Sequence, residues 1–134
     1  MAINPLTSQT SSTQENVQPL TDFSNRSVKF KLAISEKLDN KFMFKDLKPN
    51  ECERLWKFIS STVNCGLSIT EVNELWLRKK GPNGPKNIET FNGKERKMYH
   101  LGKDRKSFRI HGYYNEDDYF VICRVDPNHA FKYK

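Results

Sequence analysis

The chain has 134 residues, with 23 lysines and arginines against 16 acidic residues, for a formal net charge of +7. This length indicates one domain with a modest core, and no apolar run approaches the roughly 18 residues of a membrane-spanning helix. The first residues lack the basic and apolar regions of a secretory signal, and the 3 cysteines are too few and scattered for a disulfide framework. We therefore expect a cytoplasmic protein with reduced thiols and an anionic partner.

The N-terminal segment differs in composition from the rest of the chain. Residues 1–26 are rich in Ser, Thr, Gln and Asn and offer little apolar surface to bury. Such a segment cannot offset the entropy lost on ordering. We predict a disordered tail over residues 1–26, followed by a single α+β domain over residues 27–134.

Two short strands are expected at the start of this domain. Apolar residues alternate with lysine or alanine from Val28 to Ile34, which is the period of a half-buried strand. A second strand is predicted at residues 41–47, with Phe42 and Phe44 on one face. Residues 39–40, Asp-Asn, have good turn chemistry, so the two strands are expected to form a hairpin.

Two helices follow. Pro49 introduces the first helix, and Gly66 suits its C-terminal end. Ser68 and Glu71 match a capping box for the second helix, which is expected to run to about Lys80. The short connection predicts an antiparallel helical hairpin. The apolar stripes are Leu55, Phe58, Ile59, Thr62 and Val63 on the first helix, and Val72, Leu75 and Trp76 on the second.

Strands return in the last third of the chain. Residues 81–93 are expected to form a breaker-rich loop and then irregular chain. Strands are predicted at residues 97–101, 107–114 and 119–125, and the polar turn between the last two indicates a hairpin. The predicted fold is α+β, an antiparallel sheet with a helical hairpin packed on one face.

The positive charge is concentrated in one window. Residues 78–109 hold 11 basic and 3 acidic side chains, so the rest of the chain is close to neutral. Such a segregated patch is typical of a face that binds phosphates, and a solvated lysine-rich loop is the alternative. The predicted RNA-binding residues are Arg78, Lys79, Lys80, Lys97, Lys103, Arg105 and Lys106.

One strand carries a pair of residues suited to phosphodiester chemistry. Arg109 and His111 are two residues apart, so we expect their side chains to project the same way, roughly 7 Å apart on an exposed sheet face. A cation beside an imidazole can bind a phosphate and move a proton. His129 would add a second acid or base, and Tyr133 would stack on a base. Ordinary surface residues are the alternative reading of each.

Other chemistry finds less support in the sequence. His100, His111, Cys123 and His129 lack the spacing of known metal-binding motifs. Motifs for nucleotide-dependent and acyl-transfer enzymes are missing as well. We therefore expect no metal, no cofactor and no membrane partner.

The C-terminal third resembles the RelE/YoeB-type bacterial toxins, which are small ribosome-associated endoribonucleases. The resemblance lies in RKSFRIHGYYNEDDYFVICRVDPNHAFKY, residues 105–133. There a basic strand beginning Arg109-Ile110 precedes a strand ending in Arg124, followed by His129 and Tyr133. A helical hairpin before antiparallel strands is also similar to that family.

The resemblance implies a RelE-like fold and metal-independent cleavage of messenger RNA by attack of the 2′-hydroxyl on the adjacent phosphate. It implies that Lys106, Arg109 and Arg124 hold the phosphate. His129 would then be the acid or base, and Tyr133 would orient or stack a base. RNA or the ribosome would be the target, and a small acidic antitoxin-like protein the neutralising partner.

Two main hypotheses about function follow. The first is an RNA-binding endoribonuclease of this type, with Arg109, Arg124, His129, His111 and Tyr133 as catalytic candidates. The second is a non-catalytic nucleic-acid-binding protein, or an interaction protein of a phage or mobile element, that uses the same basic face. A protein adaptor whose charge meets an acidic partner is a third reading.

Overall fold

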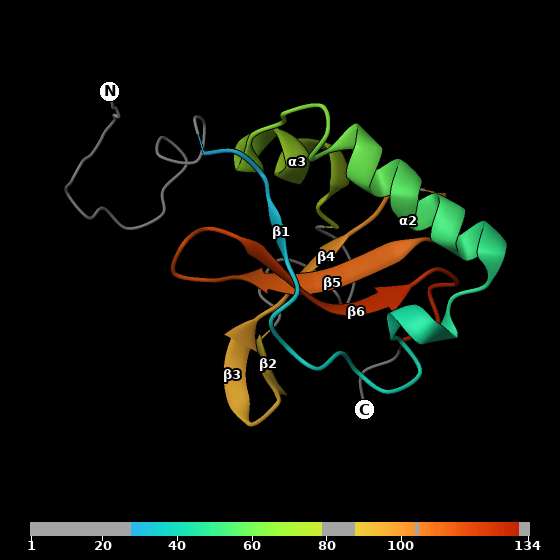
Figure 1. Cartoon of the computed structure of the whole chain (residues 1–134). Coiled ribbons are helices and arrows are strands. Elements are labelled where there is room, and N and C mark those ends of the chain that lie inside the picture. The colour runs from blue at the N-terminus through green and yellow to red at the C-terminus, as the bar shows by residue number, and fades with distance from the viewer. Residues whose placement is uncertain (1–27, 79–87, 104, 132–134) are drawn as a thin grey trace.

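The computed structural model describes residues 28–78, 88–103 and 105–131 and has an α+β fold, as predicted (Figure 1). The predicted tail, residues 1–26, and the predicted loop at 81–87 lie outside the described residues. The elements in chain order are β1 (Leu32–Ala33), the 3-10 helix η1 (Phe44–Asp46), α2 (Pro49–Ser61), α3 (Ile69–Trp76), β2 (Ile88–Phe91), β3 (Lys94–Lys97), β4 (Tyr99–Leu101), β5 (Arg109–Tyr114) and β6 (Phe120–Asp126).

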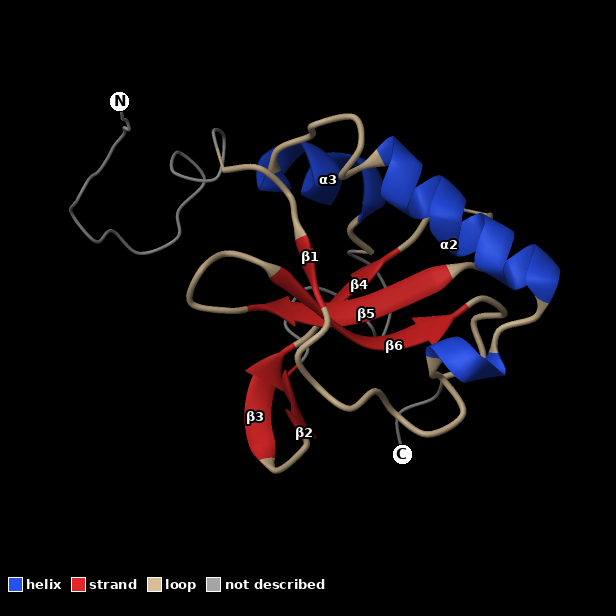
Figure 2. Ribbon diagram, viewed as in Figure 1, coloured by secondary structure: helices blue, strands red, loops and turns tan. Residues whose placement is uncertain are grey.

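The main sheet has four strands in the order β1-β6-β5-β4. The β6, β5 and β4 strands pair antiparallel, but β1 runs parallel to β6, with Leu32 opposite Phe120. The sheet is therefore mixed, and the prediction of a purely antiparallel sheet is wrong at this edge. β2 and β3 form a separate antiparallel pair. Figure 2 shows α2 and α3 on one side of the main sheet and the β2–β3 hairpin on the other.

The hairpin of β5 and β6 forms the centre of the sheet and matches the prediction closely. All seven residues of β6 are buried. The pairing shifts register between His111 and Gly112, which is a β-bulge. A Cβ atom on Gly112 would lie 2.2 Å from the carbonyl oxygen of Val121, so this position has no room for any side chain.

The two predicted helices are confirmed, and the capping box of α3 forms as expected. Ser68 Oγ accepts a hydrogen bond from the backbone N–H of Glu71 at 3.1 Å, and Glu71 accepts one from the N–H of Ser68 at 2.9 Å. The helix ends at Trp76, before the predicted Lys80. Its stripe is also narrower than predicted, because Leu75 is 59% exposed.

The chain on either side of α3 is hydrogen-bonded to opposite edges of the main sheet. Before the helix, the backbones of residues 67 and 69 bond to residues 30 and 28 beside β1, at 2.9 and 2.8 Å respectively. After it, residues 76 and 78 bond to residues 102 and 100 at the end of β4, at 2.7 and 2.8 Å. An eight-residue helix is about 12 Å long and four strands span about 14 Å, so the lengths match.

The apolar core is divided between the two faces of the sheet. The larger cluster lies between the sheet and the helices and includes Phe30, Phe58, Ile69, Ile110 and Phe120. A smaller cluster lies on the other face, where Phe91 and Met98 pack against Tyr113, Val121 and Cys123. The β2–β3 hairpin and its connection to β4 therefore cover a face that a simple two-layer fold would leave open.

Two local predictions are wrong, one before the first helix and one after the second. Residues 41–47 contain η1 rather than a strand, because the Asp46 carboxylate accepts the backbone N–H of Met43 at 3.0 Å and closes a helical turn. Phe42 and Phe44 consequently contact different groups. Phe42 packs edge-on against Phe131, whereas Phe44 joins the core under the helices. Residues 88–91, expected to be irregular, form β2.

The predicted first strand is present but short. Only Leu32–Ala33 pairs with β6, although Phe30 reaches the core as its alternation predicts. Among the described residues, no helix is long and apolar enough to cross a membrane.

Candidate functional site

The strand residues predicted to be catalytic do not lie on an exposed face. Arg109 is 5% exposed and His111 is 1% exposed. Phe108 and Ile110 pack under the helices, so Arg109 and His111 project to the other side, where other segments cover them. The loop before β5 encloses Arg109, and chain distant in sequence covers His111. The ring of Phe131 packs edge-on against His111 at 5.5 Å, and Glu89 of β2 binds the neighbouring Arg124. The expectation of an open phosphate-binding pair is therefore wrong.

Arg124 is the centre of a buried polar cluster. Its side chain is 1% exposed and forms ion pairs with Glu89 and with Asp39, the latter at 2.7 Å. It also donates to Nδ1 of His111 at 2.9 Å, and the ring of Phe131 lies 3.7 Å from its guanidinium carbon. Burial works to lower the pKa of Arg124, but its bonds to Glu89 and Asp39 outweigh burial and raise it. The charge of Arg124 is thus neutralised inside the protein.

Two histidines beside Arg124 are held in the neutral form. His100 and His111 stack with ring centroids 3.6 Å apart. Burial, with the charge of Arg124 second, lowers the pKa of His100 to about 3. Burial and the neighbouring His100 lower the pKa of His111 well below its usual value. Because an arginine can only donate, Nδ1 of His111 accepts and its proton lies on Nε2.

Arg109 organises the loop between β4 and β5. Its Nη1 atom donates to the carbonyl of Lys106 at 2.5 Å and to that of Phe108 at 2.8 Å. It also lies 3.4 Å from the carbonyl of Lys103. These bonds draw the backbone of a basic loop around one buried guanidinium and leave the loop's own cations facing solvent. Arg109 therefore stabilises the backbone of the loop that carries Lys103, Arg105 and Lys106, and is not itself exposed to a ligand.

The remaining predicted site residues are distributed around the molecule. His129 is exposed, with a positive φ of 53°, just after β6. Arg78 bonds through its backbone to His100, and Lys97 of β3 lies over the ring of Tyr99. Three predicted RNA-binding residues do gather on the β4–β5 loop: Lys103, Arg105 and Lys106, all exposed. Lys79, Lys80 and Tyr133 lie outside the described residues.

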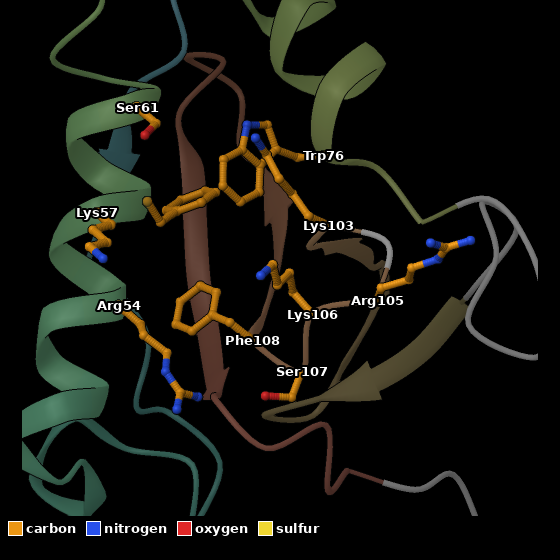
Figure 3. A pocket seen from close by; sticks show the side chains of 10 residues that line it. Arg54, Lys57, Ser61, Trp76, Lys103, Arg105, Lys106, Ser107 and Phe108 are labelled. Atoms are coloured by element: carbon orange, nitrogen blue, oxygen red, sulfur yellow. The ribbon is translucent and has the colours of Figure 1, made fainter.

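This basic loop forms one wall of a groove, and helix α2 forms the other (Figure 3). The groove has a volume of about 590 Å³. It is lined by Arg54, Lys57, Phe58, Ser61, Trp76, Lys103, Arg105, Lys106, Ser107 and Phe108. We call it the basic groove.

The floor of the basic groove is aromatic. Phe58 meets Trp76 edge-on with ring centroids 4.9 Å apart, and Phe108 lies 6.1 Å from Phe58. The ammonium of Lys103 lies over the ring of Trp76, 4.7 Å from its centroid. One face of the indole is therefore covered by an exposed lysine side chain.

The rim of the basic groove is strongly cationic. Five of the ten described lining residues are lysine or arginine, and none of the ten is acidic. Arg54 donates to the carbonyl of Pro127 at 3.2 Å, and Ser107 donates to the same oxygen at 2.8 Å. Because both donate to Pro127, this residue just after β6 links the α2 wall of the groove to the loop wall. The arrangement suits an anion that also carries a flat, apolar group.

The sequence reasoning missed the contribution of the helices to this groove. Arg54 and Lys57 are one turn apart, a signal that they share a helix face. Trp76 was assigned to the core, and it does pack against Phe58. Nothing local to the sequence indicates that this face of α2 lies across a groove from Lys103 and residues 105–108, because that arrangement depends on the tertiary fold.

Metal binding and similarity to known proteins give no further assignment. Among the described residues, no cluster of His, Cys, Asp and Glu could hold a metal ion. No protein-family model matches the chain, and no curated protein or solved structure matches it significantly.

Proposed function

We propose that this protein binds RNA, and that the basic groove is its principal contact with the phosphate backbone. The observation that carries the proposal is the set of five lysine and arginine side chains on the groove rim, without a carboxylate among the described lining residues. Each cation near a phosphate releases condensed counterions, which favours binding of a polyanion.

The non-catalytic form of this function has the better support. The pair Arg109 and His111 is enclosed, and the lowered pKa of His111 leaves no readily protonated base there. Arg124 is already bound to two carboxylates. An endoribonuclease of the RelE type would have to rely on exposed His129 and on the groove cations, and the same experiment tests that hypothesis.

The test measures RNA affinity against salt. A fluorescent single-stranded RNA of about 12 nucleotides is titrated with protein at several salt concentrations. The Lys57→Gln/Lys106→Gln variant should bind about tenfold more weakly near 0.1 M salt, with a slope of log K against log salt that is smaller by about 1.4. Both lysines are exposed, so the fold should be unaffected.

The matched control removes two exposed lysines elsewhere. Lys37→Gln/Lys94→Gln has the same net charge as the groove variant, and neither lysine lines the groove. It should retain nearly wild-type affinity and slope. Equal losses in both variants would contradict the proposal, because binding would then follow net charge alone. RNA recovered from each titration is run on a gel, and cleavage lost in His129→Ala would favour the endoribonuclease.

A further inference from the structure

We propose that the basic groove accepts an unpaired nucleotide whose base stacks on Trp76, so that the protein prefers single-stranded RNA to a duplex. This inference rests on the proposed RNA-binding function and adds the class of RNA. It follows from the aromatic floor of the groove, which binding to phosphates alone does not require.

The first argument is the position of Trp76. Phe58 supports the indole from the core side, and the exposed Lys103 covers the ring at 4.7 Å. A lysine side chain on the surface can move aside at little cost, whereas a core side chain cannot. A base could therefore replace the Lys103 ammonium on the ring while Lys103 turns to a phosphate. Stacking of this kind accepts any base.

The second argument is the arrangement of charge around that ring. Figure 3 shows Arg54 and Lys57 on the α2 side and Lys103, Arg105 and Lys106 on the loop side, with the aromatic rings between them. A single strand of RNA lying along the groove would have cations on both sides of its backbone, and its bases would face the aromatic rings of the floor. In a duplex the bases are stacked on one another inside the helix, so they would not stack on the aromatic floor of the groove, and duplex RNA would gain no affinity from it.

The third argument is size and rigidity. A groove of about 590 Å³ falls within the range of pockets for small organic ligands, which includes a nucleotide. The bonds from Arg109 to the carbonyls of Lys106 and Phe108 fix the loop wall before anything binds. Less ordering of the loop on binding leaves more of the contact energy as affinity.

The experiment uses Trp76 as its own reporter. The Trp56→Phe variant removes the other tryptophan, which is 59% exposed and lies outside the groove. Single-stranded RNA, the same sequence as a duplex, the free mononucleotide and inorganic phosphate are each titrated. We expect quenching of Trp76 by the single strand, with about tenfold tighter binding than to the duplex. The mononucleotide should quench only at much higher concentration, and phosphate should not quench.

A second pair of variants separates stacking from charge. In the Trp56→Phe background, Trp76→Leu should lose most of the preference for the single strand while duplex binding stays the same. Trp76→Phe keeps a ring and should retain part of that preference. Circular dichroism checks the fold of both Trp76 variants. The quenching measured in the Trp56→Phe protein tests the inference even if neither Trp76 variant folds.

Each outcome distinguishes the two proposals. Equal affinity for single strand and duplex without quenching would overturn the stacking inference and leave RNA binding standing. No binding of either RNA would overturn both. If the free mononucleotide bound as tightly as the oligonucleotide, the groove would be a pocket for single nucleotides, and the proposal that it binds an RNA chain would be overturned.

Discussion

Arg124 shows how a residue suited to holding a phosphate can be committed to the interior. Its acidic partners Asp39 and Glu89 come from distant parts of the chain, and His111 lies opposite it in the β5–β6 hairpin. The alternation of β5 correctly predicts that Arg109 and His111 share a face. It cannot predict the burial of His111, because the ring that covers it is that of Phe131, 20 residues further along the chain.

The buried histidines predict how stability depends on pH. The pKa of His100 falls to about 3 in the folded protein and that of His111 falls well below its usual 6.5, so neither binds a proton at mildly acid pH. In the unfolded chain both bind protons below about pH 6.5. The unfolded state therefore gains protons as the pH falls, and stability should be lost progressively from about pH 6.5 downward.

Urea unfolding between pH 7.5 and 5 measures this effect. Each histidine contributes a slope that approaches about 1.4 kcal/mol per pH unit once its unfolded form is protonated. His100→Asn should reduce the combined slope by about half. A free energy of unfolding that is constant from pH 7 to 5 would show that the two rings take up protons in the folded state.

At the scale of elements, the capping box of α3 makes a direct prediction. Ser68→Ala removes the hydroxyl that accepts the N–H of Glu71, and the free energy of unfolding should fall by about 1 kcal/mol. Glu74→Ala is the matched control on the exposed side of the same helix, and it should change stability by less than about 0.5 kcal/mol. Chemical denaturation measures both. Equal effects would mean that the cap contributes no more than helix propensity does.

Elements with complete local signals were predicted well. The Ser68–Glu71 box placed the start of α3, and the strong β propensity of β5 and β6 placed the central hairpin. The failures have weak local signals. Residues 41–47 carry β-prone phenylalanines, but the Asp46 carboxylate closes a turn on Met43. β2 has no apolar alternation to indicate a strand. It is held in place partly by the ion pair between Glu89 and Arg124, a contact distant in sequence that no local pattern predicts.

Of the two walls of the basic groove, the sequence predicts only the residues of the loop wall. The charge window of the sequence contains Lys103, Arg105 and Lys106, so the loop side could be found from composition. The helix side depends on how α2 is placed over the sheet, which its apolar stripe implies but does not specify. The same stripe puts Phe58 into the core and Arg54 and Lys57 at the rim.

At the scale of the whole molecule, the two sheets should differ in local stability. β5 and β6 lie at the centre of the main sheet and are almost wholly buried, whereas most residues of β2 and β3 are exposed. A two-stranded hairpin alone is marginally stable, and this one is held by Phe91 and by the ion pair between Glu89 and Arg124.

Native-state hydrogen exchange measures this difference. Paired amides of β5 and β6 should exchange only through global unfolding, and those of β2 and β3 at least about tenfold faster. Glu89→Gln weakens the bond to Arg124, so it should accelerate the hairpin amides further. Uniform protection of both sheets would show that the hairpin opens only with the rest of the fold.

The two ends of α3 also determine how this sheet can meet other proteins. Unpaired strand edges act as templates for strands from other chains, and proteins commonly shield them. Here the backbone beside β1 is occupied by residues 67 and 69, and that at the end of β4 by residues 76 and 78. The edge strands themselves have only two and three residues. In the part of the chain that the structure describes, a partner or a second copy therefore finds little edge backbone to extend, and we expect contacts with the main sheet to form through side chains.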